Sequence, residues 1–362
     1  MFVSHLSLKD FRSYENLELS LKAGQNIFIG ENGEGKTNII EALMYLALLS
    51  SHRISSDQPL IKLDSERAYI RAKIESDERT TLVELEINNG KANRAKVNQN
   101  PVRSQKELLG LVKSVCFSPE DLDLVRGDPS ERRSFLDQLL IQQSPRLAGV
   151  ISDYERALKQ RNSLLKSRAP ESSLRSWSEH LATFGGELIA GRIKLINEIE
   201  PLFQIAYKNL SAKKLAKLGY KSSIPAPSSE KEVNKEVMLK VIEEVKSQEI
   251  ERGISLVGPH RDDLILNLGD HPVKGYASHG ESWSIALALR LASYQLFINE
   301  GAKPILILDD VFSELDEGRR EKLLEIADSA EQTFITVAVE NDLPKAIQGA
   351  RFKVELGKVV TL

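Results

Sequence analysis

The stretch Gly30-Glu31-Asn32-Gly33-Glu34-Gly35-Lys36-Thr37 decides the fold of this 362-residue chain. It matches the pattern G-x-x-x-x-G-K-[ST], a loop that wraps a nucleotide phosphate between a strand and a helix. The surroundings agree with the pattern, because the apolar residues 26–29 precede the loop and apolar positions at helical spacing, from 39 to 47, follow it. The sequence therefore predicts an α/β domain that begins around a phosphate-binding loop.

Each residue type in this loop has a physical role. Glycine permits a tight turn whose backbone N–H groups converge on phosphate oxygens, and the N-terminus of the following helix adds a favourable potential. Lys36 can reach the β and γ phosphates, and Thr37 offers a hydroxyl to Mg²⁺. The residues that we expect to bind ATP are Gly30, Asn32, Gly33, Gly35, Lys36 and Thr37.

Two adjacent carboxylates end an apolar segment near the other end of the chain, Pro304-Ile305-Leu306-Ile307-Leu308-Asp309-Asp310. A strand that ends in this way brings an acid next to the Mg²⁺ of a phosphate-binding loop. We expect Asp309 to be the metal-side acid, and we expect Asp310 and Lys36 to be catalytic, Asp310 by orienting the attacking water. The alternative is that both acids cap the following helix.

A turn of serine and glycine, Tyr276-Ala277-Ser278-His279-Gly280-Glu281, leads into apolar positions at helical spacing. It opens a helix N-terminus to an anion, although an ordinary helix start is the preferred interpretation of this turn alone. Taken in order, the loop, this turn, the paired acids and Ser313-Glu314-Leu315-Asp316 resemble the Walker A, signature, Walker B and D-loop motifs of ABC ATPases. The resemblance implies an ATP-dependent homodimer in which Ser278 and Gly280 contact the γ phosphate bound by the opposing subunit.

The chain departs from that superfamily at two places. Asp310 stands where most ABC ATPases have a glutamate, and its shorter side chain predicts slow hydrolysis. After the next predicted strand the chain reads Thr336-Val337-Ala338-Val339-Glu340, without the histidine that is frequent there. No residue in the sequence is assigned to the contact that this histidine makes.

The chain is longer than one compact core usually needs, which predicts two domains or one domain with a large insertion. Asp128 and Pro129 suit the start of a helix, and helical patterns continue to about Lys221. A loop rich in proline and serine, 223–229, and a helix, 231–246, precede the return of strand patterns. We predict an α/β ABC-type ATPase head, residues 1–127 and 247–362, with a mostly helical inserted domain, residues 128–246.

The composition is that of a folded protein, with a hydrophobic share of 41%, a charged share of 28% and a net charge of −3. Charges at Lys9, Asp10 and Arg12 come too early for a signal peptide, and no run approaches the roughly 18 apolar residues of a membrane span. The single cysteine, Cys116, lies in an apolar stretch and has no second cysteine to pair with. We therefore expect a soluble protein of the reducing cytoplasm.

The segment Pro119 to Asp137, PEDLDLVRGDPSERRSFLD, closely resembles a signature of the RecF family. FRSYENLEL (11–19), LKQRNSLLK (158–166) and GPHRDDL (258–264) are similar to that family too, and in it the Asp-Asp pair is usual. RecF proteins are bacterial repair factors of the response to DNA damage, including the SOS response. The resemblance implies a weak, Mg-dependent and DNA-stimulated ATPase that dimerises on gapped or double-stranded DNA and, with RecR and possibly RecO, helps to load RecA.

Independent signs of DNA binding are modest. A run of lysines without an intervening acid contains Lys208, Lys213, Lys214, Lys217 and Lys221, of which we expect Lys213, Lys214 and Lys217 to contact DNA. The alternative is a solvated helix face. Arg12 can stack on the adenine or form a surface salt bridge. His260 and His279 lack the partners of a zinc site, so we assign no structural metal.

Two other functions share the ATPase motifs. The nucleotide-binding subunit of an ABC transporter is disfavoured by the segment 119–137 and by the size of the helical insertion. A chromosome-structuring SMC-like protein is disfavoured because the middle region, about 128–246, is short and lacks the heptads of a long coiled coil.

Overall fold

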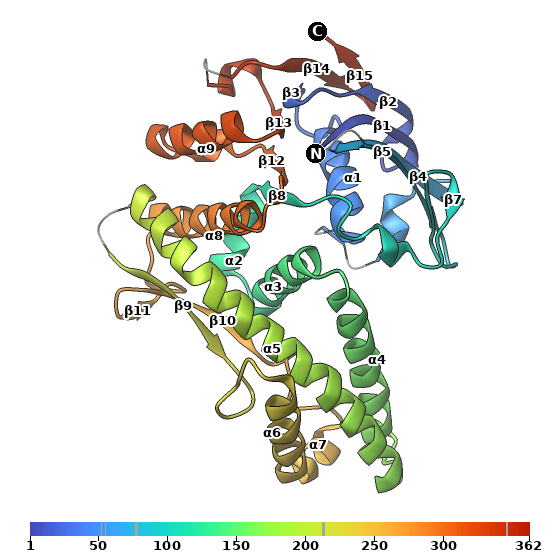
Figure 1. The fold of residues 1–362 in the computed structure, drawn as a ribbon, viewed down its shortest axis with the longest axis vertical. Helices are drawn as coiled ribbons and strands as arrows, with labels where there is room; N and C mark the ends of the chain where they lie inside the picture. Colours follow the sequence, from blue (N-terminus) through green and yellow to red (C-terminus); the bar gives the residue numbers. More distant parts are fainter. Residues whose placement is uncertain (52, 55, 77–78, 212–213, 345–346) are drawn as a thin grey trace. The chain divides into compact units, whose positions relative to one another are not determined.

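A computed structural model describes residues 1–51, 53–54, 56–76, 79–211, 214–344 and 347–362. The chain divides into two compact units (Figure 1). The first contains Met1–Asp121 and Leu289–Leu362, and the second contains Leu122–Ala288.

The first unit contains a six-stranded sheet in the order β15-β14-β3-β13-β12-β8. Its strands are β3 (Gly24–Ile29), β8 (Ser114–Phe117), β12 (Ile305–Asp309), β13 (Gln332–Val337), β14 (Ala350–Glu355) and β15 (Lys358–Thr361). All neighbours are parallel except β14 and β15, so the carboxyl ends of β3, β12 and β13 lie at one edge. Ligands of α/β sheets bind at such an edge.

A second sheet of the first unit is antiparallel, in the order β2-β1-β4-β5-β6-β7. Its strands are β1 (Phe2–Phe11), β2 (Tyr14–Ser20), β4 (Arg67–Ser76), β5 (Arg79–Asn88), β6 (Arg94–Val97) and β7 (Asn100–Pro101). On β4 every second residue from Ala68 to Ile74 is buried, as expected for a sheet with one face in the core. The strand expected from the apolar residues 26–29, before the loop, is β3 and is confirmed.

Helix α1 (Lys36–Leu48) lies inside the core of the first unit. Ten consecutive residues, 39–48, are buried, and the core combines side chains of both sheets with those of α1. A helix that is apolar on nearly all sides is stable only in such a position. Helix α9 (Glu317–Ser329) begins after Asp316, whose side chain accepts a hydrogen bond from the Arg319 amide at 3.0 Å. The core thus holds the first turn of α1 in a fixed place.

The second unit is mostly helical. Its helices are α2 (Leu122–Arg126), α3 (Pro129–Gln143), α4 (Leu147–Lys166), α5 (Glu171–Leu210), α6 (Lys231–Glu244) and α7 (Lys246–Arg252). Helices α4 and α5 run side by side, and α6 packs on α5 (Figure 1). Two glycines permit the contact of α5 with α6, since a Cβ atom at Gly185 would lie 2.9 Å from Met238 Sδ and one at Gly186 would lie 2.7 Å from Lys231 O.

One part of the predicted helical region is wrong. Helix α5 ends at Leu210, and Ala216–Lys221 forms a strand, β9, instead of continuing the helix to about Lys221. The segment alternates buried and exposed positions, which is the period of a strand, and it pairs with β10 (Asp263–Leu268) in a small antiparallel sheet with β11 (His271–Pro272). The lysine run is therefore not one helix face.

The pairing of β9 with β10 also bears on the boundary between the two compact units. The predicted inserted domain ended at residue 246, whereas the second compact unit extends from Leu122 to Ala288. Strand β10 joins the helical unit because its hydrogen-bonding partner β9 belongs there. Helix α8 (His279–Asn299) begins in the second unit and ends in the first.

Several segments that carry the family resemblance meet in the second unit. Arg132, in the segment 119–137, donates two hydrogen bonds to Asp263 at 2.8 and 2.9 Å. Arg192 donates to both oxygens of Asp137 at 2.9 Å and to the carbonyl of Pro259 at 2.7 Å. Both arginines are buried, so these residues hold α3, α5 and β10 together.

Within the described ranges, no helix is both long enough and apolar enough to cross a membrane. Cys116 is buried on β8, and burial raises the pKa of its thiol well above the ordinary value. A buried thiol whose pKa is raised forms little of the reactive thiolate.

Candidate nucleotide-binding site

The predicted phosphate-binding loop joins β3 to α1 in a conformation that requires glycine. Gly33 and Gly35 have φ angles of +91° and +113°, in the left-handed region. A Cβ atom at Gly35 would lie 2.9 Å from Tyr14 Oη, and one at Gly30 would lie 2.4 Å from the carbonyl oxygen of Val354. No atom would lie within 4 Å of a Cβ at Gly33, so this part of the loop faces open space.

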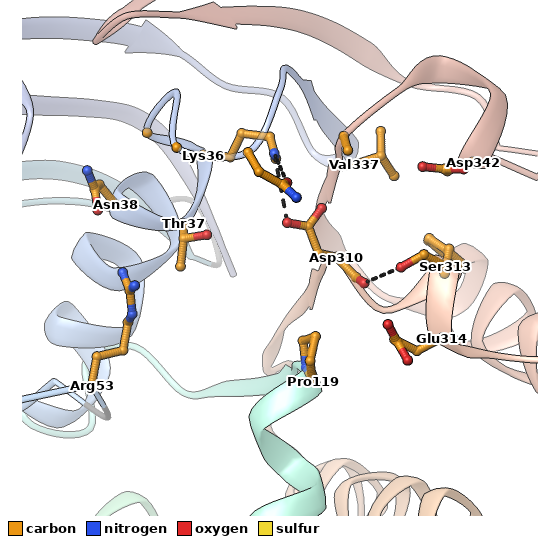
Figure 2. A pocket seen from close by; sticks show the side chains of 15 residues that line it. Lys36, Thr37, Asn38, Arg53, Pro119, Asp310, Ser313, Glu314, Val337 and Asp342 are labelled. Atoms are coloured by element: carbon orange, nitrogen blue, oxygen red, sulfur yellow. Dashed lines mark hydrogen bonds and ion pairs between the residues drawn. The ribbon is translucent and has the colours of Figure 1, made fainter. Parts of the chain in front are cut away.

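Lys36 is buried at the start of α1, and its ammonium group turns toward the loop (Figure 2). The Nζ atom donates to the carbonyl oxygens of Gly30 at 2.7 Å and of Glu31 at 3.2 Å. It also lies 3.8 Å from Oδ2 of Asp310. A buried cation with mainly neutral partners is suited to a strong anion such as a phosphate.

Asp310 occupies an unusual backbone conformation, with a φ angle of +51°. Its amide donates to the hydroxyl of Thr336 at 3.0 Å, and its carbonyl accepts a hydrogen bond from Ser313 Oγ at 3.2 Å. Its carboxylate points toward Lys36 (Figure 2). Burial raises the pKa of this carboxyl, and the charge of Lys36 opposes the shift.

Asp309 is buried at the end of β12 and accepts a hydrogen bond from Thr336 Oγ1 at 2.5 Å. Burial raises the pKa of Asp309 to about 6, although the hydrogen bond from Thr336 lowers it. Asp310 lines the cavity beside the loop, whereas Asp309 is not among the described residues that line it. The magnesium role of Asp309 therefore remains a prediction.

A cavity of about 510 Å³ lies between the loop and the end of β12. The predicted residues that line it are Asn32, Gly33, Gly35, Lys36, Thr37 and Asp310. Residues at the D-loop-like segment and at and after the end of β13 also line it, namely Phe312, Ser313, Glu314, Val337, Ala338 and Asp342. The tertiary structure thus brings three distant segments of the chain to one cavity.

Two charged residues of this cavity were not predicted as part of the site. Arg53 follows α1, and Asp342 follows β13, and both line the cavity. Neither belongs to a motif with fixed spacing, because each lies in a connecting segment whose path depends on the packing of the sheet. No signal in the sequence singled them out.

The charges of the cavity fit Mg²⁺ and a polyphosphate together. Lys36 and the N-terminus of α1 favour an anion. Burial is the main reason why the pKa values of Asp309 and Asp310 are raised, and neighbouring carboxylates add to the shift. A divalent cation would favour the ionised carboxylates, and Thr37 lines the same cavity with a hydroxyl.

The signature-like turn lies in the second unit, where it forms a reciprocal helix cap. The Ser278 amide donates to Glu281 Oε2 at 2.9 Å, and the Glu281 amide donates to Ser278 Oγ at 3.2 Å. Ser278 is exposed, and its side chain is also hydrogen-bonded to the Glu281 carboxylate. Gly280 lies in the first turn of α8. The structure thus presents this serine at a helix N-terminus, as a contact to an anion requires.

The predicted DNA-contacting lysines have different surroundings. Lys213 lies outside the described residues. Lys214 forms a hydrogen-bonded ion pair with Glu281 at 2.8 Å. This bond and the hydrogen bonds from Ser278 lower the pKa of Glu281 to about 2. Lys217 is exposed on β9, on the same side of the strand as Lys221.

Arg12 forms a salt bridge, but with a buried partner and not at the surface as predicted. It donates to both oxygens of Glu41, at 2.7 and 2.6 Å, and Glu41 is fully buried. Burial raises the pKa of Glu41, but the hydrogen bonds from Arg12 and Ser51 outweigh burial and hold it below the ordinary value. Stacking of Arg12 on an adenine stays a prediction.

Comparison with known proteins gives consistent matches. A family model described as the RecF/RecN/SMC N terminal domain matches residues 2–355. The chain is 52% identical to the DNA replication and repair protein RecF of Streptomyces avermitilis over 371 residues, which cover 99% of both chains. It is 49% identical to the protein of that name from Kineococcus radiotolerans, with 96% of both chains covered.

Solved structures agree. The recombination mediator protein RecF-ATP of the RecFOR pathway superposes with a TM-score of 0.91 at 28% identity, covering 100% of this chain and 97% of that one. The Smc head domain of Pyrococcus furiosus, with a TM-score of 0.56, 17% identity and coverage of 100% and 96%, shares the fold alone. The predicted ABC-type ATPase fold is confirmed, and by its family model, its relatives and its structure this chain belongs to the RecF family.

Proposed function

We propose that this protein is an ATP-dependent DNA-binding protein of recombinational repair and replication-fork maintenance. In this proposal ATP drives two copies together on gapped or double-stranded DNA, and slow hydrolysis releases them. The observation that carries the proposal is the single cavity in which Lys36, Thr37 and Asp310 meet, in a chain of the RecF family. Family membership also removes the support for a transporter subunit.

The residues of the cavity, together with the neighbouring Asp309, would divide the work of ATP hydrolysis. Lys36 and the loop amides would bind the phosphates, and Thr37 and Asp309 would hold Mg²⁺. When bound, Mg²⁺ neutralises charge on the β and γ phosphates. Asp310 orients the attacking water, and its carboxylate is close enough to Lys36 to be kept in place before the nucleotide enters.

Dimerisation would complete the site. Ser278 is exposed at the N-terminus of α8, so its hydroxyl can exchange its hydrogen bond with Glu281 for one to a γ phosphate held by a second copy, with Gly280 close beside it. Hydrolysis would remove that contact and open the dimer. Weak, Mg-dependent and DNA-stimulated ATPase activity follows from this cycle.

The partners in this proposal come from the family. Solved relatives are described as recombination mediator proteins of the RecFOR pathway, which supports RecR, and possibly RecO, as partners that help to load RecA. DNA would contact basic residues of the second unit, among them Lys213, Lys214 and Lys217. A cytoplasmic location belongs to the same proposal.

Sedimentation tests the proposal directly. Wild type, Lys36→Ala and Ser278→Arg are compared with and without Mg-ATP and a gapped duplex. We expect ATP to shift only the wild type to a DNA-bound dimer, because Lys36→Ala removes the phosphate contact and Ser278→Arg blocks the facing surface. If all three variants bind DNA alike as monomers, the ATP-gated dimer is wrong.

A further inference from the structure

Thr336 lies where β13 runs beside the paired acids. It is fully buried near the end of β13, and in the parallel register it stands opposite Asp309 of β12. Sequence motifs single out the two acids but give no role to this threonine, which lies outside the Walker B segment.

One hydroxyl group makes both contacts. Thr336 Oγ1 donates its single proton to Asp309 Oδ1 at 2.5 Å, and the same oxygen accepts a hydrogen bond from the Asp310 amide at 3.0 Å. The Asp310 amide also approaches the Thr336 carbonyl at 3.3 Å. The side chain of one acid and the backbone of the next are therefore tied to a single atom.

The second contact, in which Thr336 Oγ1 accepts from the Asp310 amide, involves a residue with a strained backbone. Asp310 has a φ angle of +51°, which costs energy for a residue with a side chain and persists only where the surroundings hold it. The chain leaves β12 at this point, and the conformation directs the carboxylate into the cavity beside Lys36 (Figure 2). Loss of the Thr336 hydroxyl removes one of the groups that hold this conformation.

We propose that Thr336 is a positioning residue for ATP hydrolysis. Its hydroxyl fixes the Asp309 carboxylate and the Asp310 backbone relative to each other. This inference rests on the proposed ATPase function. The group touches neither nucleotide nor water in this proposal, and it acts through the two acids. An error of about 1 Å in the place of a catalytic group lowers rates by roughly 100-fold, which is the scale of effect such a residue controls.

A purely structural role is the competing explanation, and the same strand offers a matched control. Thr333 is also fully buried on β13, and its hydroxyl donates to the Ala327 carbonyl at 3.1 Å. Thr333→Val therefore also removes a buried, hydrogen-bonded hydroxyl from β13, but it leaves the two acids untouched. The two variants separate loss of a buried hydrogen bond from loss of positioning.

The experiment measures steady-state ATP hydrolysis and thermal unfolding for wild type, Thr336→Val, Thr336→Ser and Thr333→Val. We expect Thr336→Val to lower kcat about tenfold or more with KM for ATP within about twofold, because the phosphate-binding loop is unchanged. Thr336→Ser keeps the hydroxyl and should restore kcat to within about threefold of wild type. Thr333→Val should keep the wild-type kcat.

The outcomes are distinct. Equal losses of kcat in Thr336→Val and Thr333→Val would show that the hydroxyl only stabilises the strand, and a wild-type kcat in Thr336→Val would also overturn the inference. The inference would also be overturned if Thr336→Ser were as stable as wild type but did not recover kcat. Absence of ATP hydrolysis in the wild type, by contrast, would count against the proposed function itself.

Discussion

The Nζ atom of Lys36 lies 3.8 Å from Oδ2 of Asp310, which joins the first turn of α1 to the end of β12. Both side chains line the same cavity, and the lysine is the more deeply buried of the two. The cation proposed to bind phosphate and the acid proposed to act on water are thus placed together by the parallel sheet.

This relationship predicts that Asp310→Asn separates ATP binding from hydrolysis. Asparagine has the same size and tolerates the left-handed backbone of this position, so the fold should be kept. It cannot accept a proton from water, and we expect kcat to fall by about 100-fold or more while ATP affinity is retained. Single-turnover hydrolysis with an equilibrium ATP-binding assay measures both quantities. An unchanged kcat would remove Asp310 from the mechanism.

Lys217 provides a test of DNA contact on the second unit. It is exposed on β9, so Lys217→Ala should not affect folding. If the side chain neutralises one DNA phosphate, the slope of log Kobs against log salt should become less negative by about 0.9. Lys240→Ala, an exposed lysine on α6, is the control. Equal slopes for wild type and Lys217→Ala would show that this lysine is only solvated.

The buried pair Arg161–Glu249 predicts a large effect on stability. The side chains are 2% and 0% exposed, and Arg161 also donates to Ser178 and Ser255. Glu249→Ala leaves a buried cation without its partner and should lower the free energy of unfolding by roughly 3–5 kcal/mol. Urea unfolding measures this change.

An exposed pair in the same unit is the control for that measurement. Arg175 and Glu179 are 3.7 Å apart on α5, with side chains 82% and 59% exposed. Glu179→Ala should change the free energy of unfolding by less than about 1 kcal/mol, because solvent screens the pair. Similar losses in both variants would contradict a special role for the buried arginine.

His260 predicts a loss of stability in mild acid. Tyr154 Oη lies 2.5 Å from its Nδ1 atom, and burial lowers the pKa of the imidazole from 6.5 to about 4. Between these values the unfolded chain binds the proton and the folded chain does not, so stability falls as the pH drops through this window and is fully present above it. The expected loss between pH 7.5 and 5 is about 2 kcal/mol.

Calorimetry of wild type and His260→Gln at the two pH values isolates this contribution. Glutamine has hydrogen-bonding atoms but no titration in this range, so the variant should lose less stability than wild type on acidification. Groups common to both proteins cancel in the difference. An identical pH dependence would show that His260 is not the group that titrates.

Much of the candidate site could be predicted from the sequence, because the residues of each motif are neighbours in the chain. The loop from Gly30 to Thr37 needs glycines at particular φ angles and a helix directly after it, and these requirements appear as adjacent letters. The paired acids are equally visible, because an apolar strand leads straight into them. The segments that resemble RecF were visible too, and the comparisons confirmed the family.

Other features depended on which segments meet. The sequence predicts helical structure to about Lys221, whereas Ala216–Lys221 forms the strand β9 because it pairs with β10. Arg53 and Asp342 reached the cavity through connecting segments that carry no motif.

The sequence by itself determined the family, the strand and the helix on either side of the loop from Gly30 to Thr37, and the paired acids that follow an apolar strand, since these depend on short-range patterns. Only the tertiary structure decided that Thr336 bridges Asp309 and Asp310 and that Lys36 faces Asp310. The physical reason is register: parallel strands distant in the chain place one particular side chain opposite another, and a shift of one residue would turn each side chain to the other face of the sheet.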